Sequence, residues 1–343
     1  MEKRTATIQD VAARAGVSIT TVSRVLNDTG YPMRPETKRR VMEAIEALEF
    51  RPSPLARGLL GKSTRTIALI IPDISNPYYP LLSRGVEDVA SQHDYTVIFC
   101  NTDRGLAKLH SYLEVLREKQ VDGIIFAGGG IDVEGASLPL EEVRGPVVLV
   151  GRHRWPFPSV QVDNVGAAYE ATSHLLGLGH RRVAFLGGPT TLTSARDRLK
   201  GYRQAMEELG GGAESSLIHQ GDFGFESGYQ AARSLLQAGG LRPTALFAAN
   251  DQMALGALAA TTDLEIRVPD ELAVIGFDDI PAGRYVRPSL STISLPTYEM
   301  GASAARLLLK LLAGEPAEQL LWLPTRLVIR QSSGRSVAVT LGS

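Results

Sequence analysis

The chain has 343 residues, 44% hydrophobic and 21% charged, with a formal net charge of −1. This length suggests two or three domains with ordinary hydrophobic cores, and the composition excludes a disordered chain, a collagen and a coiled coil. We find no run of 18 apolar residues and no secretory signal near the N-terminus, so no membrane span is indicated. The single cysteine, Cys100, excludes an internal disulfide, and we expect a cytoplasmic protein.

Charge is distributed unevenly along the chain. Residues 1–62 contain 11 Lys and Arg against 7 Asp and Glu, whereas the remainder contains 25 against 30. A small basic head on a mildly acidic body is a modest indication that the head contacts nucleic acid.

The first 50 residues predict three short helices. Apolar spacing indicates one over 8–15, a second that begins after an N-cap at Ser18, and a third that begins at Pro35. The prolines that follow Phe50 end the third helix and open a short fourth piece up to Gly61.

From Thr66 onward, short apolar runs alternate with amphipathic stretches. The runs are 66–71, 96–101, 123–128, 146–151, 182–187, 245–250 and 272–277. The helical stretches are 78–92, 105–119, 164–178, 196–209, 225–238, 250–262 and 298–313. This alternation predicts parallel sheets covered by helices. About ten strands are too many for one compact sheet, so we expect two α/β lobes.

The segment 7–27, TIQDVAARAGVSITTVSRVLN, predicts a helix-turn-helix. Gly16 suits the tight turn, and Val22 and Val25 suit the inward face of the second helix. The outward face and the two helix starts would then carry the candidate DNA contacts, because short polar groups reach base edges and helix starts attract phosphate. These candidates are Thr7, Ser18, Ile19, Thr20, Ser23, Arg24 and Asn27. A three-helix bundle that binds protein, or nothing, is the alternative.

The stretches DVAARAGVS, VSRVLN and PETKRRVMEAIEALEFRPSPLARGL resemble the signature of the LacI/GalR family of bacterial transcription regulators. The resemblance continues through most of the chain. It implies a homodimer that binds a palindromic operator, usually as a repressor. A small-molecule effector would control this binding, and a sugar or sugar derivative is favoured. The implied fold is a small all-α helix-turn-helix head plus a two-lobed, Rossmann-like α/β body of the periplasmic-binding-protein type.

The resemblance also divides the chain. It implies a head over 1–50 and a hinge helix with linker over 51–63. The N-terminal lobe would be 64–163 plus 293–325, and the C-terminal lobe 164–292 plus 326–343. In the hinge, Leu59 would wedge into the minor groove of DNA, with Ala56 and Arg57 beside it. The alternative is that Leu59 packs on the body.

Seven positions are candidates for the effector cleft that the resemblance implies, Arg152 being a weaker one than the rest. Several follow strands, where ligands of open α/β sheets bind. Aromatic faces can stack on a sugar ring, an arginine fork suits vicinal hydroxyls or a carboxylate, and amide and carboxylate groups suit hydroxyls. The seven are Tyr78, Tyr79, Arg152, Arg198, Phe223, Asn250 and Asp278. Packing of the two tyrosines at a helix start is an equal alternative.

No catalytic constellation, metal site or cofactor is indicated. The glycines at 128–130 follow a strand without the G-x-G-x-x-G pattern of a dinucleotide site. Asp278 and Asp279 are adjacent, so their side chains should point to opposite sides of a strand end. Two alternatives from other classes are a ligand-binding receptor without DNA function and a sugar- or nucleoside-processing enzyme.

Overall fold

The structure is a computed structural model that describes residues 6–26, 32–50, 63–128, 145–153, 155–210, 212–238 and 242–334. The chain forms two compact units, Met1–Thr64 and Arg65–Ser343, which we call the head and the body. The expected hinge residues Ala56, Arg57 and Leu59, together with Asn27, lie outside the described residues.

The head contains the three predicted helices, α1 Ile8–Ala15, α2 Ile19–Leu26 and α3 Pro35–Ala47. Helix α1 starts with a capping box, in which Thr7 and Asp10 satisfy each other's backbone N–H groups. It ends at Gly16, whose φ of 63° is the left-handed conformation that glycine adopts readily. The inward faces form one buried cluster of Val11, Ala12, Ala15, Val22, Val25, Val41 and Ala44.

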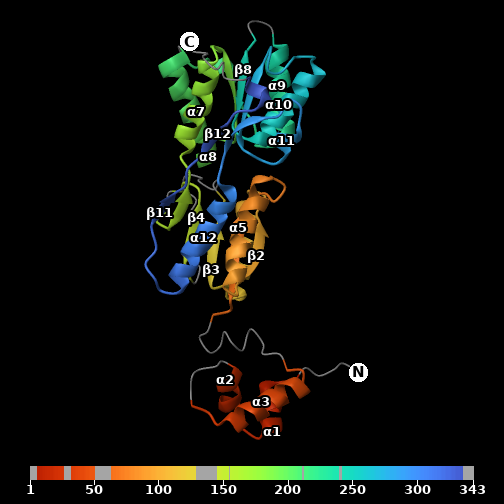
Figure 1. The fold of residues 1–343 in the computed structure, drawn as a ribbon, viewed down its shortest axis with the longest axis vertical. Helices are drawn as coiled ribbons and strands as arrows, with labels where there is room; N and C mark the ends of the chain where they lie inside the picture. The colour runs from red at the N-terminus through yellow and green to blue at the C-terminus, as the bar shows by residue number, and fades with distance from the viewer. Residues whose placement is uncertain are drawn as a thin grey trace, which may run out of the picture. The chain divides into compact units, whose positions relative to one another are not determined.

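The body consists of two α/β lobes, one above the other in Figure 1. The N-terminal lobe has a parallel sheet in the order β11-β5-β4-β3-β1-β2. Its strands are β1 Thr66–Ile71, β2 Thr96–Asn101, β3 Gly123–Phe126, β4 Val147–Val150, β5 Ser159–Gln161 and β11 Leu320–Trp322. Helices α5 Tyr78–Gln92 and α12 Thr297–Leu312 cover one face, and α6 Leu106–Glu118 covers the other.

The C-terminal lobe has a second sheet, in the order β12-β10-β9-β8-β6-β7, in which only the β10–β12 pair is antiparallel. Its strands are β6 Val183–Gly187, β7 Ile218–Gln220, β8 Ala245–Ala248, β9 Ala273–Asp278, β10 Ser291–Ser294 and β12 Arg326–Val328. Its helices are α7 Asn164–Gly177, α8 Thr193–Ala205, α9 Phe225–Gln237, α10 Asp251–Asp263 and the short α11 Ala282–Tyr285. A π-helical turn, Met206–Gly210, extends α8, and single 3₁₀ turns lie at Ser215–Leu217 and Gln331–Ser333.

The chain passes between the lobes three times. The passages lie between β5 and α7, between β10 and α12, and between β11 and β12. Position 293, where the sequence placed a boundary, falls inside β10 of the C-terminal sheet. The boundary therefore lies after Ser294, because β10 pairs with β9 along its whole length.

The helices that cover the sheets approach one another closely at glycines. A Cβ on Gly85 of α5 would overlap the carbonyl oxygen of Tyr298 in α12, and a Cβ on Gly301 of α12 would overlap that of Leu82. Contact at backbone distance explains how α5 and α12 fit side by side on one face of the sheet. The apolar strands are buried on both faces, as parallel sheets require.

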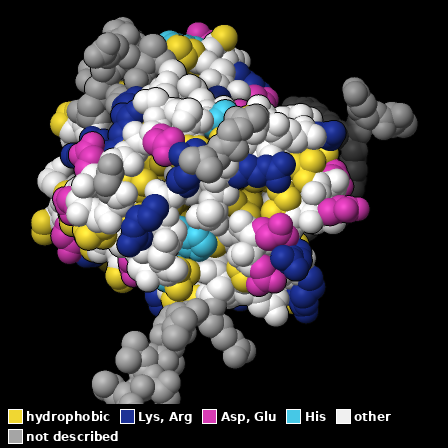
Figure 2. Space-filling view, turned by 90° about the horizontal axis from the view of Figure 1, so that it is seen from above, with side chains coloured by type: hydrophobic (Ala, Val, Ile, Leu, Met, Phe, Trp, Pro, Cys, Tyr) yellow, Lys and Arg dark blue, Asp and Glu magenta, His cyan; other side chains and the backbone are white. Residues whose placement is uncertain are grey.

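No helix among the described residues is long and apolar enough to cross a membrane. On the face seen in Figure 2, basic and acidic side chains are interspersed among hydrophobic ones. The described part of that face therefore presents no field of a single sign to a polyanion.

Candidate functional site

A pocket that is partly open to solvent lies between the two lobes of the body. Both lobes contribute to its wall, and most of the polar groups come from strand ends and helix starts. The lining residues are Pro72, Asn76, Tyr78, Tyr79, Arg104, Ala127, Gly128, Val150, Gly151, Val162, Asn164, Leu192, Ser194, Arg198, Phe223, Asn250, Asp278, Leu295 and Met300. The pocket thus lies at the carboxyl ends of parallel strands, where open α/β sheets bind ligands.

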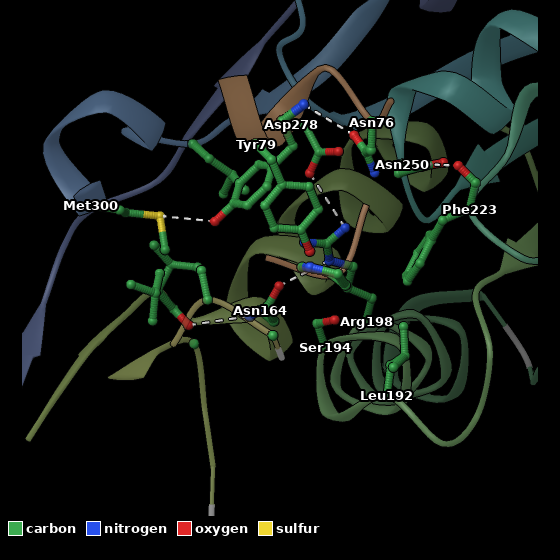
Figure 3. A pocket seen from close by; sticks show the side chains of 18 of the residues that line it. Asn76, Tyr79, Asn164, Leu192, Ser194, Arg198, Phe223, Asn250, Asp278 and Met300 are labelled. Carbon is green, nitrogen blue, oxygen red and sulfur yellow. Dashed lines mark hydrogen bonds and ion pairs between the residues drawn. The ribbon is translucent and has the colours of Figure 1, made fainter. Parts of the chain in front are cut away.

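Arg198 from α8 is the central polar group of this pocket (Figure 3). Its Nε donates to Oδ1 of Asn164 at 2.9 Å, and its Nη1 donates to the carbonyl oxygen of Ala249 at 2.5 Å. The guanidinium lies 3.7 Å from the centre of the Phe277 ring. Burial lowers the pKa of Arg198, and the carboxylate of Asp278 opposes that shift. Among the described residues, Nη2 has no partner, so it can donate to a bound ligand.

Asp278, the last residue of β9, faces Arg198 with 3.5 Å between Oδ1 and Nη1. Burial raises the pKa of Asp278 to about 8, against the opposing effect of Arg198. Asp279 points elsewhere: it accepts from Arg284 at 3.0 Å and from Arg330 at 2.5 Å. The two neighbouring carboxylates therefore belong to different environments, one in the pocket and one in a network that fixes the loop.

Asp251 holds the strand end that carries Asp278. Its fully buried carboxylate accepts from the backbone N–H of Ile280 at 2.8 Å and from the hydroxyl of Thr292 at 2.6 Å. Asp278 and Asp279 have φ angles of 122° and 62°, which are unusual for residues other than glycine. The two bonds to Asp251 stabilise this turn, because they connect the start of α10 to the loop after β9 and to strand β10.

Aromatic side chains form part of the pocket wall. Tyr78 and Tyr79 meet edge to face with ring centres 5.0 Å apart, and the Tyr78 hydroxyl donates to Sδ of Met300 at 3.5 Å. Burial raises the pKa of both tyrosines, so both stay neutral. Phe223 has a φ of 70°, and its carbonyl oxygen accepts from Nδ2 of Asn250 at 2.8 Å. Its ring occupies the space that a Cβ on Gly188 would need.

The structure brings six of the seven expected residues to this pocket. They are Tyr78, Tyr79, Arg198, Phe223, Asn250 and Asp278. Arg152 is not among the lining residues; its guanidinium binds the carboxylate of Asp197 on α8. Sequence reasoning missed the polar groups Asn76, Arg104, Asn164 and Ser194. Asn164 was hidden because strand β5 before it has only three residues, too few to predict.

In the head, helix α2 exposes the side chains that the sequence placed outward. Ile19 is 46% exposed, Thr20 and Arg24 are exposed, and Ser23 is half-buried. The hydroxyls of the two helix starts are used locally. Thr7 Oγ1 donates to Asp10 at 2.7 Å, and Ser18 Oγ accepts from the N–H of Thr21 at 3.2 Å.

Comparisons with known proteins agree with this architecture. Residues 7–53 match the family described as bacterial regulatory proteins, lacI family, and residues 172–333 match a periplasmic binding protein-like domain. The chain is 41% identical over 333 residues to the HTH-type transcriptional regulator DegA of Bacillus subtilis (strain 168), covering 95% of this chain and 98% of that protein. The chain belongs to the lacI family of bacterial regulatory proteins.

Further relatives extend the same family. Catabolite control protein A of Priestia megaterium is 40% identical, with 95% of this chain and 99% of that protein covered. A solved complex of the transcriptional regulator CelR with cellobiose has a TM-score of 0.71 at 31% identity, covering 95% and 99% of the two chains. The lac repressor dimer bound to operator and the anti-inducer ONPF has a TM-score of 0.86 at 28% identity, covering 97% and 100%. The lacI-family resemblance and the fold class expected from the sequence are confirmed, and the chain is a DNA-binding transcriptional regulator.

Proposed function

We propose that this lacI-family regulator represses transcription as a homodimer on a palindromic operator, and that a small sugar-like molecule in the body pocket controls it. The pocket carries this proposal. It combines guanidinium groups, a carboxyl and neutral amides with aromatic rings, the groups that bind the hydroxyls and faces of a sugar. Among relatives of similar fold, one was solved with cellobiose and another, from Enterococcus faecium, with ribose.

The effector contacts we propose are Tyr78, Tyr79, Arg198, Phe223, Asn250 and Asp278. Arg198 and Asp278 would bind neighbouring hydroxyls, since one donates and the other accepts. Because Arg198 and Asp278 belong to the C-terminal lobe and the tyrosines to the N-terminal lobe, a bound ligand contacts both lobes. Binding would therefore favour one angle between the lobes, which is the differential contact that allosteric control requires.

The exposed face of α2 is the proposed reader of DNA bases. The side chains there are Ile19, Thr20, Ser23 and Arg24, with the start of α1 at Thr7 and the start of α2 at Ser18 oriented toward phosphates. Arg24 can donate to guanine, and Ile19 can contact a thymine methyl group. A regulator of this kind acts where the chromosome lies, so we place it in the cytoplasm, as a binding protein rather than an enzyme.

The proposed dimer contact lies on the edge of the body at β2. Phe99, on edge strand β2, is 47% exposed, and its register partner Leu69 places it on the face of the sheet that α5 covers. Leu81 of α5 and Ile74 are also about half exposed, and the Ile74 N–H is bound to Asn101 at the end of β2. Large apolar side chains that remain exposed on an edge strand and on the helix covering the sheet are typical of a protein–protein contact.

The test measures ligand binding and its effect on operator affinity. An operator is first selected from random duplexes with the full-length protein. Sugars, sugar phosphates and nucleosides are then screened by thermal shift; a ligand at 100 times its dissociation constant should add about 2.7 kcal/mol of stability. A hit that changes operator affinity supports the proposal. A hit that leaves operator affinity unchanged would contradict effector control, and failure to select any duplex would contradict the head assignment.

A further inference from the structure

Arg104 is a pocket residue that the sequence did not single out. It follows β2 in the loop before α6, has a left-handed φ of 59°, and is half-buried at the pocket wall. Although it belongs to the N-terminal lobe, its Nη1 donates to the carbonyl oxygen of Asp222 in the C-terminal lobe at 2.8 Å. Asp222 directly precedes Phe223, so Arg104 is anchored beside the aromatic wall of the pocket.

The charges of the pocket wall do not balance. The lining residues include two guanidinium groups, Arg104 and Arg198, and one carboxyl group, Asp278. Asp278 lies beside Arg198, so it compensates that charge. No carboxylate of the described residues lies within ion-pair distance of Arg104, and its contact with Asp222 is to a neutral carbonyl oxygen. The lining side chains therefore include one guanidinium, that of Arg104, without an ion-pair partner among the described residues.

The acidic groups near Arg104 are occupied by other partners. The carboxylate of Asp103 accepts from Lys108 and from Asn101, both at 2.6 Å. The carboxylate of Asp222 accepts from the N–H of Gly224 at 2.7 Å. Arg104 helps to lower the pKa of Asp222, so the two charges attract each other at longer range. Neither carboxylate forms an ion pair with Arg104, so its guanidinium can still contact a bound anion.

A half-buried guanidinium with spare donors suits an anion. Nη1 of Arg104 is used by Asp222, and the described residues provide no partner for Nε and Nη2, the two groups that form the fork for a phosphate or carboxylate. Water is partly displaced from such a cleft, which strengthens attraction between opposite charges.

We propose that the effector of this regulator is an anionic sugar derivative, whose phosphate or carboxylate group binds Arg104 while its ring lies near Arg198, Asp278 and the aromatic wall. This rests on the proposed function, because it specifies the chemical class of the ligand for the same pocket. Cellobiose and ribose, the sugars bound in two solved relatives, lack such a group.

The experiment compares matched ligands on the full-length protein by isothermal titration calorimetry. The pairs are ribose with ribose 5-phosphate, and glucose with glucose 6-phosphate and gluconate. We expect at least one anionic member to bind tenfold or more tightly than its neutral parent, with weaker binding at high salt. Arg104→Gln should reduce that preference by about tenfold. Arg117→Gln removes the same charge from an exposed position on α6 and should keep the preference.

The possible results separate the two proposals. The anionic effector would be overturned if the neutral members bind equally or more tightly, or if Arg104→Gln lowers the affinity for both members equally. Arg104 would then be only a link between the lobes, and the proposal of a sugar pocket would be unaffected. Binding of no member of any pair would instead overturn the sugar-like effector itself. Tight gluconate with weak glucose 6-phosphate would identify the carboxylate form, and the reverse would identify the phosphate form.

Discussion

Arg152 and Asp197 form a two-bond ion pair that joins the two lobes of the body. Nε of Arg152 donates to Oδ2 of Asp197 at 2.8 Å, and Nη2 donates to Oδ1 at 2.5 Å. Arg152 follows β4 in the N-terminal lobe, and Asp197 lies on α8, next to Arg198 of the pocket. The pair therefore connects the lobes beside the proposed ligand, although its arginine side chain is 52% exposed.

We predict that this pair contributes to effector affinity. In a double-mutant cycle with Arg152→Ala and Asp197→Ala, the coupling should be about 0.2–1 kcal/mol, because exposure and salt screening limit a pair of this kind. Titration calorimetry with the effector measures it. The Arg182–Glu214 pair lies within the C-terminal lobe and serves as the matched control. If the coupling energy of the control pair equals that of Arg152 and Asp197, the contact between the lobes does not contribute to effector binding.

Gly85→Ala should destabilise the body. The new Cβ would overlap the Tyr298 carbonyl, so α5 and α12 would have to separate, at a cost of about 1–3 kcal/mol. Gly177→Ala in α7 is the control, since its Cβ meets open space and alanine favours a helix by up to about 1 kcal/mol. Urea unfolding of both variants checks this. Equal stabilities of the two variants would contradict the close helix approach.

Asp278→Asn should change how stability depends on pH. The pKa of Asp278 is about 8 in the folded protein and about 3.9 in an unfolded chain. Between these values the folded state holds a proton that the unfolded state has lost, so the wild type loses stability as pH rises. Asparagine does not titrate. We therefore expect the difference in unfolding free energy, variant minus wild type, to increase from pH 4 to pH 8 and to stay level outside that window. A difference that does not change with pH would refute the raised pKa.

Arg24→Ala should weaken binding to the selected operator. A two-bond arginine–guanine contact is worth about 1–3 kcal/mol, which corresponds to roughly 5- to 150-fold in affinity. Fluorescence anisotropy at several salt concentrations measures the loss. Arg39→Ala is the control, because Arg39 lies on α3 beside Glu43. Affinity within twofold of the wild type for Arg24→Ala would remove α2 as the base reader.

Phe99→Asp should dissociate the dimer, because it places a charge in the apolar contact at the β2 edge. Trp322→Asp is the matched control, since Trp322 is 53% exposed on β11, at the opposite edge of the same sheet. Sedimentation equilibrium of both variants and the wild type gives the dissociation constants. If the dimer persists in Phe99→Asp and dissociates in Trp322→Asp, the dimer contact lies at the β11 edge instead.

The short elements show where sequence reasoning ends. The strands of four to six residues with continuous apolar runs, such as β1 and β9, were predicted close to their observed bounds. Strands β5, β7, β11 and β12 have three residues each, and all but β11 mix apolar with polar side chains. Such strands form because a neighbouring strand has backbone N–H and C=O groups that can pair with them. The periodicity of apolar residues within a short segment does not indicate this condition.

The sequence by itself determined the helix-turn-helix head, the alternation that builds two α/β lobes, and six of the pocket residues, because local periodicity, capping and family motifs depend on nearby residues. Only the tertiary structure decided that Arg152 binds Asp197 and that Arg104 lies at the pocket wall. These contacts join positions 45 and 118 residues apart, and their formation depends on how the two lobes close on each other. The two arginines thus have different roles, Arg152 in an ion pair and Arg104 at the pocket wall, because each has its partner in the opposite lobe.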